Sequence, residues 1–211
     1  MRFLNSYTGK IILANIILFV AFFIASFFID SETLFSNIAL KPATILSGEK
    51  LWTIVTSMFM HGNFTHLFLN LVSLWFIGLF VERLIGKKRF IYVYFGAGLF
   101  AGLLFILVAY FFNIDMNVYA VGASGAIFGL GGLLAILTPR LPVLVFFVIP
   151  MPMWMAMIAL LGILWIFSLG LDIPIGNVAH LGGLLLGVAY GLYLKYKYPR
   201  KTQMISKYFS R

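Results

Sequence analysis

Residues 90–114 read FIYVYFGAGLFAGLLFILVAYFFNI, which is 25 consecutive positions without a charged side chain. A helix needs about 20 apolar residues to cross the hydrocarbon core of a bilayer, so this stretch predicts one transmembrane helix. Of the 211 residues in the chain, 63% are hydrophobic and 10% are charged. Soluble domains carry about 45–50% apolar and about 25% charged residues, and disordered chains are more polar still. We therefore predict an all-α, polytopic membrane protein.

Charged residues divide the rest of the chain into similar apolar stretches. Two of these stretches, 51–81 and 141–171, are too short for two spans joined by a turn, so each predicts one span plus an extra segment. The prediction is one membrane domain over residues 1–211, with a core at about 11–195 and a basic tail at 196–211. Six transmembrane helices are predicted, at about 11–29, 63–81, 90–112, 121–138, 153–170 and 177–195.

The two extra segments differ from the spans in composition. Residues 31–60 mix apolar residues with Ser, Thr, Lys and Glu, which is typical of a structured loop in the membrane interface. Residues 141–152 contain three prolines and several β-branched residues. Proline disfavours helix interiors, so we expect extended chain there, at the membrane edge.

Lysine and arginine are distributed unequally between the predicted loops. With the N-terminus inside, the inner segments carry thirteen of them and the outer loops only Lys41 and Lys50. Basic residues accumulate on the cytoplasmic side, so both termini are predicted to be cytoplasmic in a cell-membrane protein. The net charge of +9 is then explained by topology and by contact with membrane lipids rather than by nucleic acid. No A-x-A-like cleavage site follows the first span, so we do not expect a signal peptide.

Four polar residues lie near the starts of predicted spans that all run from outside to inside. His66 and Asn70 are four residues apart, so they share one helix face. Ser124 and His180 begin two other spans. With a rise of 1.5 Å per residue, we expect His66, Ser124 and His180 to share a depth of about 5–10 Å below the outer surface. Polar side chains in hydrocarbon are costly, which makes each one a functional candidate.

Glycines provide a reason for two of these helices to meet. They recur at four-residue spacing as Gly125 and Gly129 on one helix, and as Gly183, Gly187 and Gly191 on the other. Such small-residue faces let two helix backbones approach closely. This contact would bring Ser124 within hydrogen-bond reach of His180. A serine beside an imidazole base is the minimum for nucleophilic acyl transfer.

Other chemistries fit the sequence less well. Taken singly, Ser124 could be a small packing residue, Asn70 an interhelical bond, and His61 a structural residue bonded to the backbone of the loop 31–60. HExxH is absent and the three histidines have no carboxylate at their depth, so no metal or other cofactor is predicted. The aspartates lie outside the predicted spans, which disfavours an aspartyl protease, and no charge lies near the midplane, which disfavours a transporter.

Four segments together resemble the rhomboid intramembrane serine proteases of the compact six-helix prokaryotic type. They occur in the family's order as LWTIVTSMFMHGNFTHLFLN (51–70), FVERLIG (80–86), GASGAIFGL (122–130) and AHLGGLLLG (179–187). The resemblance implies a rhomboid-like bundle in which residues 31–60 form a membrane-embedded first loop. It also implies that the helix at 153–170 and the loop at 171–176 form a substrate gate and cap.

The resemblance also implies roles for individual residues. Ser124 would be the nucleophile and His180 the general base, without a cofactor. The oxyanion hole would consist of His66, Asn70 and the backbone N–H of Ser124. Gly122 and Gly125 match the glycines around the nucleophile, while Gly183 and Gly187 support the helix contact. The implied substrates are transmembrane proteins that are cleaved near the outer leaflet.

Two residues depart from the family pattern. Thr53 replaces a frequent arginine in the first loop, which affects how that loop is anchored. Phe128 replaces a frequent tyrosine, and we expect its ring still to stack on His180. Asp172 is a weak candidate for orienting His180.

Two other functions compete with the protease. The second candidate is a non-catalytic rhomboid-like protein that binds transmembrane clients, and the third is a small-solute transporter. The sequence indicates neither the substrate nor the oligomeric state.

Overall fold

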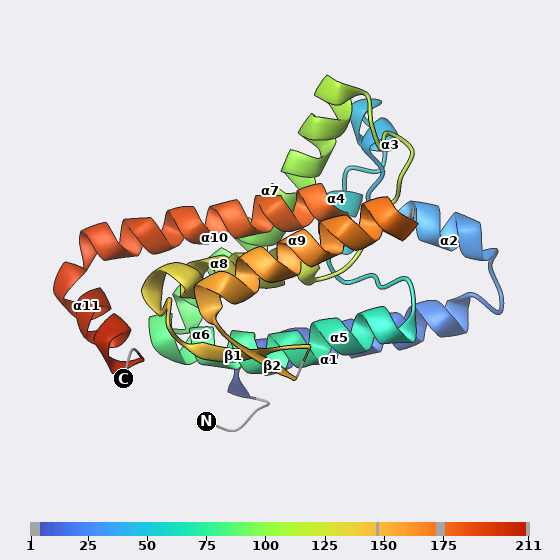
Figure 1. The fold of residues 1–211 in the computed structure, drawn as a ribbon. Coiled ribbons are helices and arrows are strands. Elements are labelled where there is room, and N and C mark those ends of the chain that lie inside the picture. The colour runs from blue at the N-terminus through green and yellow to red at the C-terminus, as the bar shows by residue number, and fades with distance from the viewer. Residues whose placement is uncertain (1–4, 147, 172–175, 210–211) are drawn as a thin grey trace.

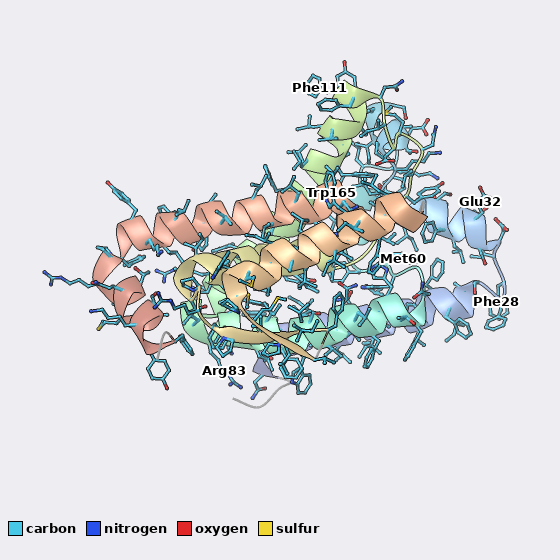
Figure 2. The ribbon with its side chains drawn as sticks, in the orientation of Figure 1. Phe28, Glu32, Met60, Arg83, Phe111 and Trp165 are labelled. Carbon is cyan, nitrogen blue, oxygen red and sulfur yellow. The ribbon has the colours of Figure 1, made fainter. Side chains whose placement is uncertain are left out.

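The computed structural model of the chain describes residues 5–146, 148–171 and 176–209, and most of them are helical. Figure 1 shows α1, α5, α9 and α10 lying roughly along one direction, while the C-terminal part of α7 rises away from them beside α3. The start of α1 and the end of α11, which are the two ends of the described chain, lie at the same end of this bundle (Figure 1). Arg83 lies at that end, and Phe28 and Glu32 lie at the opposite end (Figure 2).

The described elements are, in chain order, α1 (Tyr7–Ala25), α2 (Ser31–Ile38), α3 (Pro42–Leu46), α4 (Thr53–Thr56), α5 (Phe64–Ser73), the π-helical turn η2 (Leu74–Gly78), α6 (Leu79–Ile85), α7 (Lys87–Phe112), α8 (Ser124–Leu137), β1 (Pro142–Val145), β2 (Ile149–Pro152), α9 (Met153–Leu171), α10 (Asn177–Lys197) and α11 (Pro199–Tyr208). This helical architecture agrees with the predicted polytopic membrane protein.

Within the described residues, five helices are long and apolar enough to cross a membrane, so the predicted count of six spans is not confirmed. They are Tyr7–Ala25, Phe64–Ile85, Lys87–Phe112, Met153–Gly170 and Asn177–Lys197. The remaining predicted span contains α8, which has only 14 residues and is therefore about 21 Å long. Its short length has a physical reason: eleven of its residues are buried inside the protein, so α8 need not match the thickness of the lipid.

The first helix begins four residues earlier than the sequence pattern predicted, because two side chains bind its free N–H groups. Ser6 Oγ accepts a hydrogen bond from the Gly9 N–H at 2.9 Å. The buried Glu82 carboxylate of α6 accepts from the Tyr7 N–H at 3.0 Å, the Thr8 N–H at 2.9 Å and the Thr8 hydroxyl at 2.8 Å. A carboxylate at a helix N-terminus satisfies its orphan donors and complements its dipole.

The two extra segments fold as distinct local structures. Residues 31–60 contain the short helices α2, α3 and α4. This segment is fixed by Thr56 Oγ1, which donates to the Ile38 carbonyl at 2.8 Å, and by a two-way backbone pairing of Leu40 with Ala120. Pro142–Val145 and Ile149–Pro152 pair as the antiparallel strands β1 and β2, which agrees with the extended chain predicted for this segment. Thr53 is 1% exposed and donates to the Lys50 carbonyl at 2.8 Å, so it anchors the loop locally.

Two further features were not predicted. The second span contains the π-helical turn η2, which ends at Gly78. A Cβ on Gly78 would lie 2.8 Å from the side chain of Thr8, so α1 passes close to this turn. The basic tail is not irregular, because Pro199–Tyr208 is helical and Thr202 is buried. The ring of Phe209 also lies 5.3 Å from that of Phe80. The tail therefore folds back on the end of the bundle that carries both termini.

Candidate active site

The candidate site lies where α8 and α10 touch through their glycines. A Cβ on Gly183 would collide with the carbonyl oxygen of Gly125, and one on Gly187 would collide with that of Gly129. The two backbones are therefore in direct contact, as the small-residue spacing predicted. Because Ser124 begins α8 and His180 lies in the first turn of α10, this contact places the two residues side by side.

Ser124 and His180 form a hydrogen bond between the two helices. Ser124 Oγ lies 2.8 Å from His180 Nε2, and His180 is only 6% exposed. A neutral imidazole accepts at one ring nitrogen and carries its proton on the other. When the serine hydroxyl donates to Nε2, the proton of the ring is therefore on Nδ1. This arrangement leaves Nε2 free to take the hydroxyl proton.

Phe128 holds the plane of the His180 ring. It lies one turn after Ser124, and its ring stacks on the imidazole with a centroid distance of 4.7 Å and an interplanar angle of 19°. The stacking expected at this position is therefore present without a tyrosine hydroxyl. Phe128 restricts rotation of the imidazole and keeps Nε2 directed at Ser124.

Gly122 brings His66 close to Ser124. Its φ of +115° is a conformation that side chains with a Cβ rarely adopt. A Cβ at this position would lie 2.8 Å from His66 Nε2 and 3.7 Å from Ser124 Oγ. The Gly122 N–H donates to the Ser57 carbonyl at 2.8 Å, which ties this turn to the first loop. The absent side chain of Gly122 thus makes the room in which the imidazole of His66 approaches the serine.

Asn70 lies one turn after His66, on the helix face that its spacing predicted. Its side chain is 6% exposed, and Nδ2 donates to the His66 carbonyl at 2.9 Å. An amide nitrogen has two hydrogens, so one further hydrogen remains for another acceptor. The first turn is also fixed by Asn63, whose Oδ1 accepts from the His66 N–H at 2.8 Å. Asn63 was not singled out from the sequence, although Asn is a common N-cap residue.

His61 packs against His66, and neither of its ring nitrogens bonds to Ser124. Their ring centroids are 5.0 Å apart in an edge-on arrangement. His61 Nδ1 lies 3.3 Å from the Phe59 carbonyl, to which it donates. This bond to nearby backbone agrees with the structural reading of His61. Burial first, and the neighbouring charge of a protonated His66 second, lower the pKa of His61 to about 4. His61 is therefore neutral at pH 7.

Among the described residues, no carboxylate binds His180 Nδ1, which is buried and has no hydrogen-bond partner. Asp172 and most of the predicted cap at 171–176 lie outside the described residues. An apolar cavity of about 410 Å³ lies between α1, α2 and α4 and is lined by residues such as Leu18, Leu34 and Phe59. Its lining offers no group for acid–base chemistry, so the cluster around Ser124 is the stronger candidate.

Comparison with known proteins identifies relatives of the chain. The Rhomboid domain family model matches residues 48–197. The chain is 30% identical over 155 residues to Rhomboid protein 1, mitochondrial, of Saccharomyces cerevisiae, which covers 72% of this chain. It is 31% identical over 185 residues to Rhomboid protease GluP of Bacillus subtilis, which covers 81% of this chain. It is also 32% identical over 88 residues, 42% of this chain, to Inactive RHOMBOID-like protein 8 of Arabidopsis thaliana.

The relatives are longer than the region that they share with this chain. The match covers 44% of the yeast protein, 32% of the Bacillus protein and 23% of the Arabidopsis protein. The region that the Rhomboid domain model matches, residues 48–197, includes Ser124 and the residues around it. The remaining parts of those proteins are not matched by this chain.

Proposed function

The chain belongs to the rhomboid family, and on that premise we propose that it is an intramembrane serine endopeptidase. Ser124 is the proposed nucleophile and His180 the general base. The observation that carries this proposal is the 2.8 Å hydrogen bond between Ser124 Oγ and His180 Nε2. A serine paired with an oriented imidazole is the arrangement that activates a hydroxyl for attack on a carbonyl.

The proposed reaction has two halves. In the first, His180 Nε2 takes the hydroxyl proton as Ser124 Oγ attacks the peptide carbonyl. The protonated His180 then donates that proton to the leaving amine. The acyl group stays bound to Ser124 as an acyl-enzyme. In the second, water loses a proton to His180 as it attacks the acyl carbon, and the protonated imidazole returns that proton to Ser124 as the acid leaves. No cofactor is needed for either half.

The oxyanion of each intermediate needs hydrogen-bond donors. Three are proposed, namely His66, Asn70 and the backbone N–H of Ser124. The free amide hydrogen of Asn70 and the position of His66 at Gly122 support this assignment. Such donors act most strongly when they are fixed before charge develops in a site with little water. The caps and bonds that hold His66 and Asn70 therefore suit the proposed role.

The proposed substrates are transmembrane segments that carry small or helix-destabilising residues near the outer surface. A stable helix uses every backbone carbonyl in its own hydrogen bonds, whereas a weak helix can unwind and present one. The proposed setting is the cell membrane, with Ser124 toward its outer leaflet and both termini in the cytoplasm.

Labelling with a serine-directed fluorophosphonate probe, together with cleavage of a model transmembrane substrate, tests the proposal. We expect wild-type protein to label and to cleave. Ser124→Ala should abolish both, and His180→Ala should abolish cleavage, while expression and thermal stability stay near those of the wild type. Substantial cleavage by Ser124→Ala would show that the nucleophile is misassigned.

The alternative is a non-catalytic rhomboid-like protein that binds transmembrane clients. The similar protein from Arabidopsis thaliana is named Inactive RHOMBOID-like protein 8, so a chain that resembles this one can lack activity. A chain of that class would bind a transmembrane segment but would neither label with the fluorophosphonate nor cleave. The same experiment therefore separates the two functions.

A further inference from the structure

Two buried polar atoms on α10 lack hydrogen-bond partners among the described residues. One is Nδ1 of His180, and the other is Oδ1 of Asn177, which is the first residue of the helix. An unpaired polar atom that is shielded from water costs free energy, so each such atom calls for an explanation. The proposed reaction uses only the other ring nitrogen of His180.

The two atoms are chemically complementary. His180 Nε2 faces the Ser124 hydroxyl at 2.8 Å, so the ring proton belongs on Nδ1, which is then a donor. The Oδ1 of an asparagine can only accept. A buried donor and a buried acceptor therefore lie on the same helix, and each needs what the other provides.

The helix also directs the two side chains toward each other. Positions 177 and 180 are three residues apart, which places them on one face of α10. Side chains in an α-helix lean toward its N-terminus, so the imidazole of His180 leans over the turn that Asn177 begins. Nδ1 is the ring nitrogen nearer its own backbone, whereas Nε2 reaches across to α8. This general lean of helical side chains favours Nδ1 on the side of Asn177, although the two atoms do not bond directly, since each lacks a partner.

We infer that Asn177 is a positioning residue whose Oδ1 receives the His180 Nδ1 proton through one bridging water molecule, because neither atom has a partner of its own in the structure. This bridge fixes the tautomer in which Nε2 can accept from Ser124. It also holds the ring edge, while Phe128 holds the ring face. Asn177 acts through His180 and does not touch the reacting atoms. The inference rests on the proposed function and adds a third member to the Ser124–His180 pair.

Kinetics of three variants test this role. Asn177→Leu keeps the size of the side chain and removes the acceptor, so kcat should fall about tenfold while KM stays within about twofold. Tenfold corresponds to about 1.4 kcal/mol, the size of one neutral hydrogen bond. Asn177→Asp keeps an acceptor, and its charge suits a helix N-terminus, so it should retain about half or more of the wild-type kcat. The control is Asn37→Leu, an exposed asparagine in α2, which should change neither constant.

Two kinetic outcomes would overturn the inference. One is an unchanged kcat in Asn177→Leu, and the other is an equal loss of kcat in Asn177→Asp and Asn177→Leu, which would indicate a structural role. If Asn177→Leu does not fold, as judged by thermal unfolding, the smaller change Asn177→Ala is measured in its place with the same expectations.

A measurement on the wild-type protein needs no variant of Asn177. The chain has only three histidines, so the imidazole nitrogens can be assigned by NMR with ¹⁵N-histidine labelling and the single changes His61→Gln and His66→Gln. We expect a proton on His180 Nδ1 that exchanges slowly with solvent. A proton on Nε2 instead would overturn the inference.

The two proposals fail in different ways. Wild-type protein that neither labels nor cleaves would overturn the proposed function. Active wild-type protein with an equally active Asn177→Leu would overturn the inference alone and leave Ser124 and His180 as a dyad.

Discussion

Asn70 is the proposed oxyanion donor whose loss can be measured most cleanly. One of its amide hydrogens binds the His66 carbonyl, so only the other is available to a transition state. We expect Asn70→Ala to lower kcat and kcat/KM together, because an interaction made only in the transition state affects both equally. Removal of one such donor costs about 10²–10³ in kcat, and the two remaining donors favour the lower end. Steady-state kinetics on a model transmembrane substrate measures this loss.

The chain contains a matched control for this prediction. Asn37 makes the same type of bond, from Nδ2 to the carbonyl four residues earlier at 2.8 Å, but it lies exposed on α2. Asn37→Ala should therefore leave kcat unchanged. If Asn70→Ala keeps its kcat and only melts at a lower temperature, then Asn70 is a structural bond within the helix.

His61 predicts a pH dependence of stability. Burial lowers its pKa from 6.5 to about 4 in the folded protein. Between these values the unfolded chain binds a proton that the folded chain excludes. The free energy of unfolding should therefore fall as pH falls from about 6.5 to about 4, by at most about 3 kcal/mol. Below pH 4 this contribution should not change further.

The variant His61→Gln isolates the contribution of His61, because glutamine of similar size does not titrate. Denaturation in detergent at several pH values should show a weaker acid sensitivity in His61→Gln than in the wild type. His66 faces His61 and is a second titratable group, so the same comparison is made in a His66→Gln background. Equal acid sensitivity with and without His61 would contradict the prediction.

At the scale of the helices, the contact between α8 and α10 depends on two glycines that meet backbone. A Cβ on Gly187 would collide with the carbonyl oxygen of Gly129, which cannot move without its helix. Gly187→Ala should therefore lower the melting temperature and lower kcat, because the helices must separate and draw Ser124 away from His180. Thermal unfolding and cleavage, measured on the same sample, test this expectation.

The control glycine lies on α9. A Cβ on Gly162 has no atom within 4 Å, and Ala is favoured over Gly in a helix interior by about 1 kcal/mol. Gly162→Ala should therefore be neutral or slightly stabilising and should keep full activity. Equal losses in both variants would mean that helix propensity, rather than contact between α8 and α10, decides the effect.

The sequence predicted these elements unevenly, for physical reasons. The four-residue glycine spacing predicted the meeting of α8 and α10, because close helix contact requires small residues at that period. The length of α8 was not predictable from hydropathy, because a helix enclosed by protein has no lipid thickness to match. The start of α1 depends on Glu82, which is 74 residues away from Thr8 in the chain and leaves no local pattern. The orphan atoms of Asn177 and His180 emerged only from the packed structure.

At the scale of the whole molecule, the bundle has one end that carries both termini, and the membrane decides which way that end faces. Most of the lysines and arginines, including Arg83, Lys87, Lys88 and Arg89, lie in the segments assigned to that end, whereas only Lys41 and Lys50 lie in the segments assigned to the other. Basic residues are retained in the cytoplasm during insertion, so we expect that end to be cytoplasmic. A C-terminal fluorescent protein should then fluoresce, and alkaline phosphatase at the same position should be inactive.

The opposite reporter result would place the starts of α8 and α10, and Ser124 with them, toward the cytoplasmic leaflet. Substrates would then have to be cleaved on that side, so the reporter experiment decides where a cleavage site should be sought.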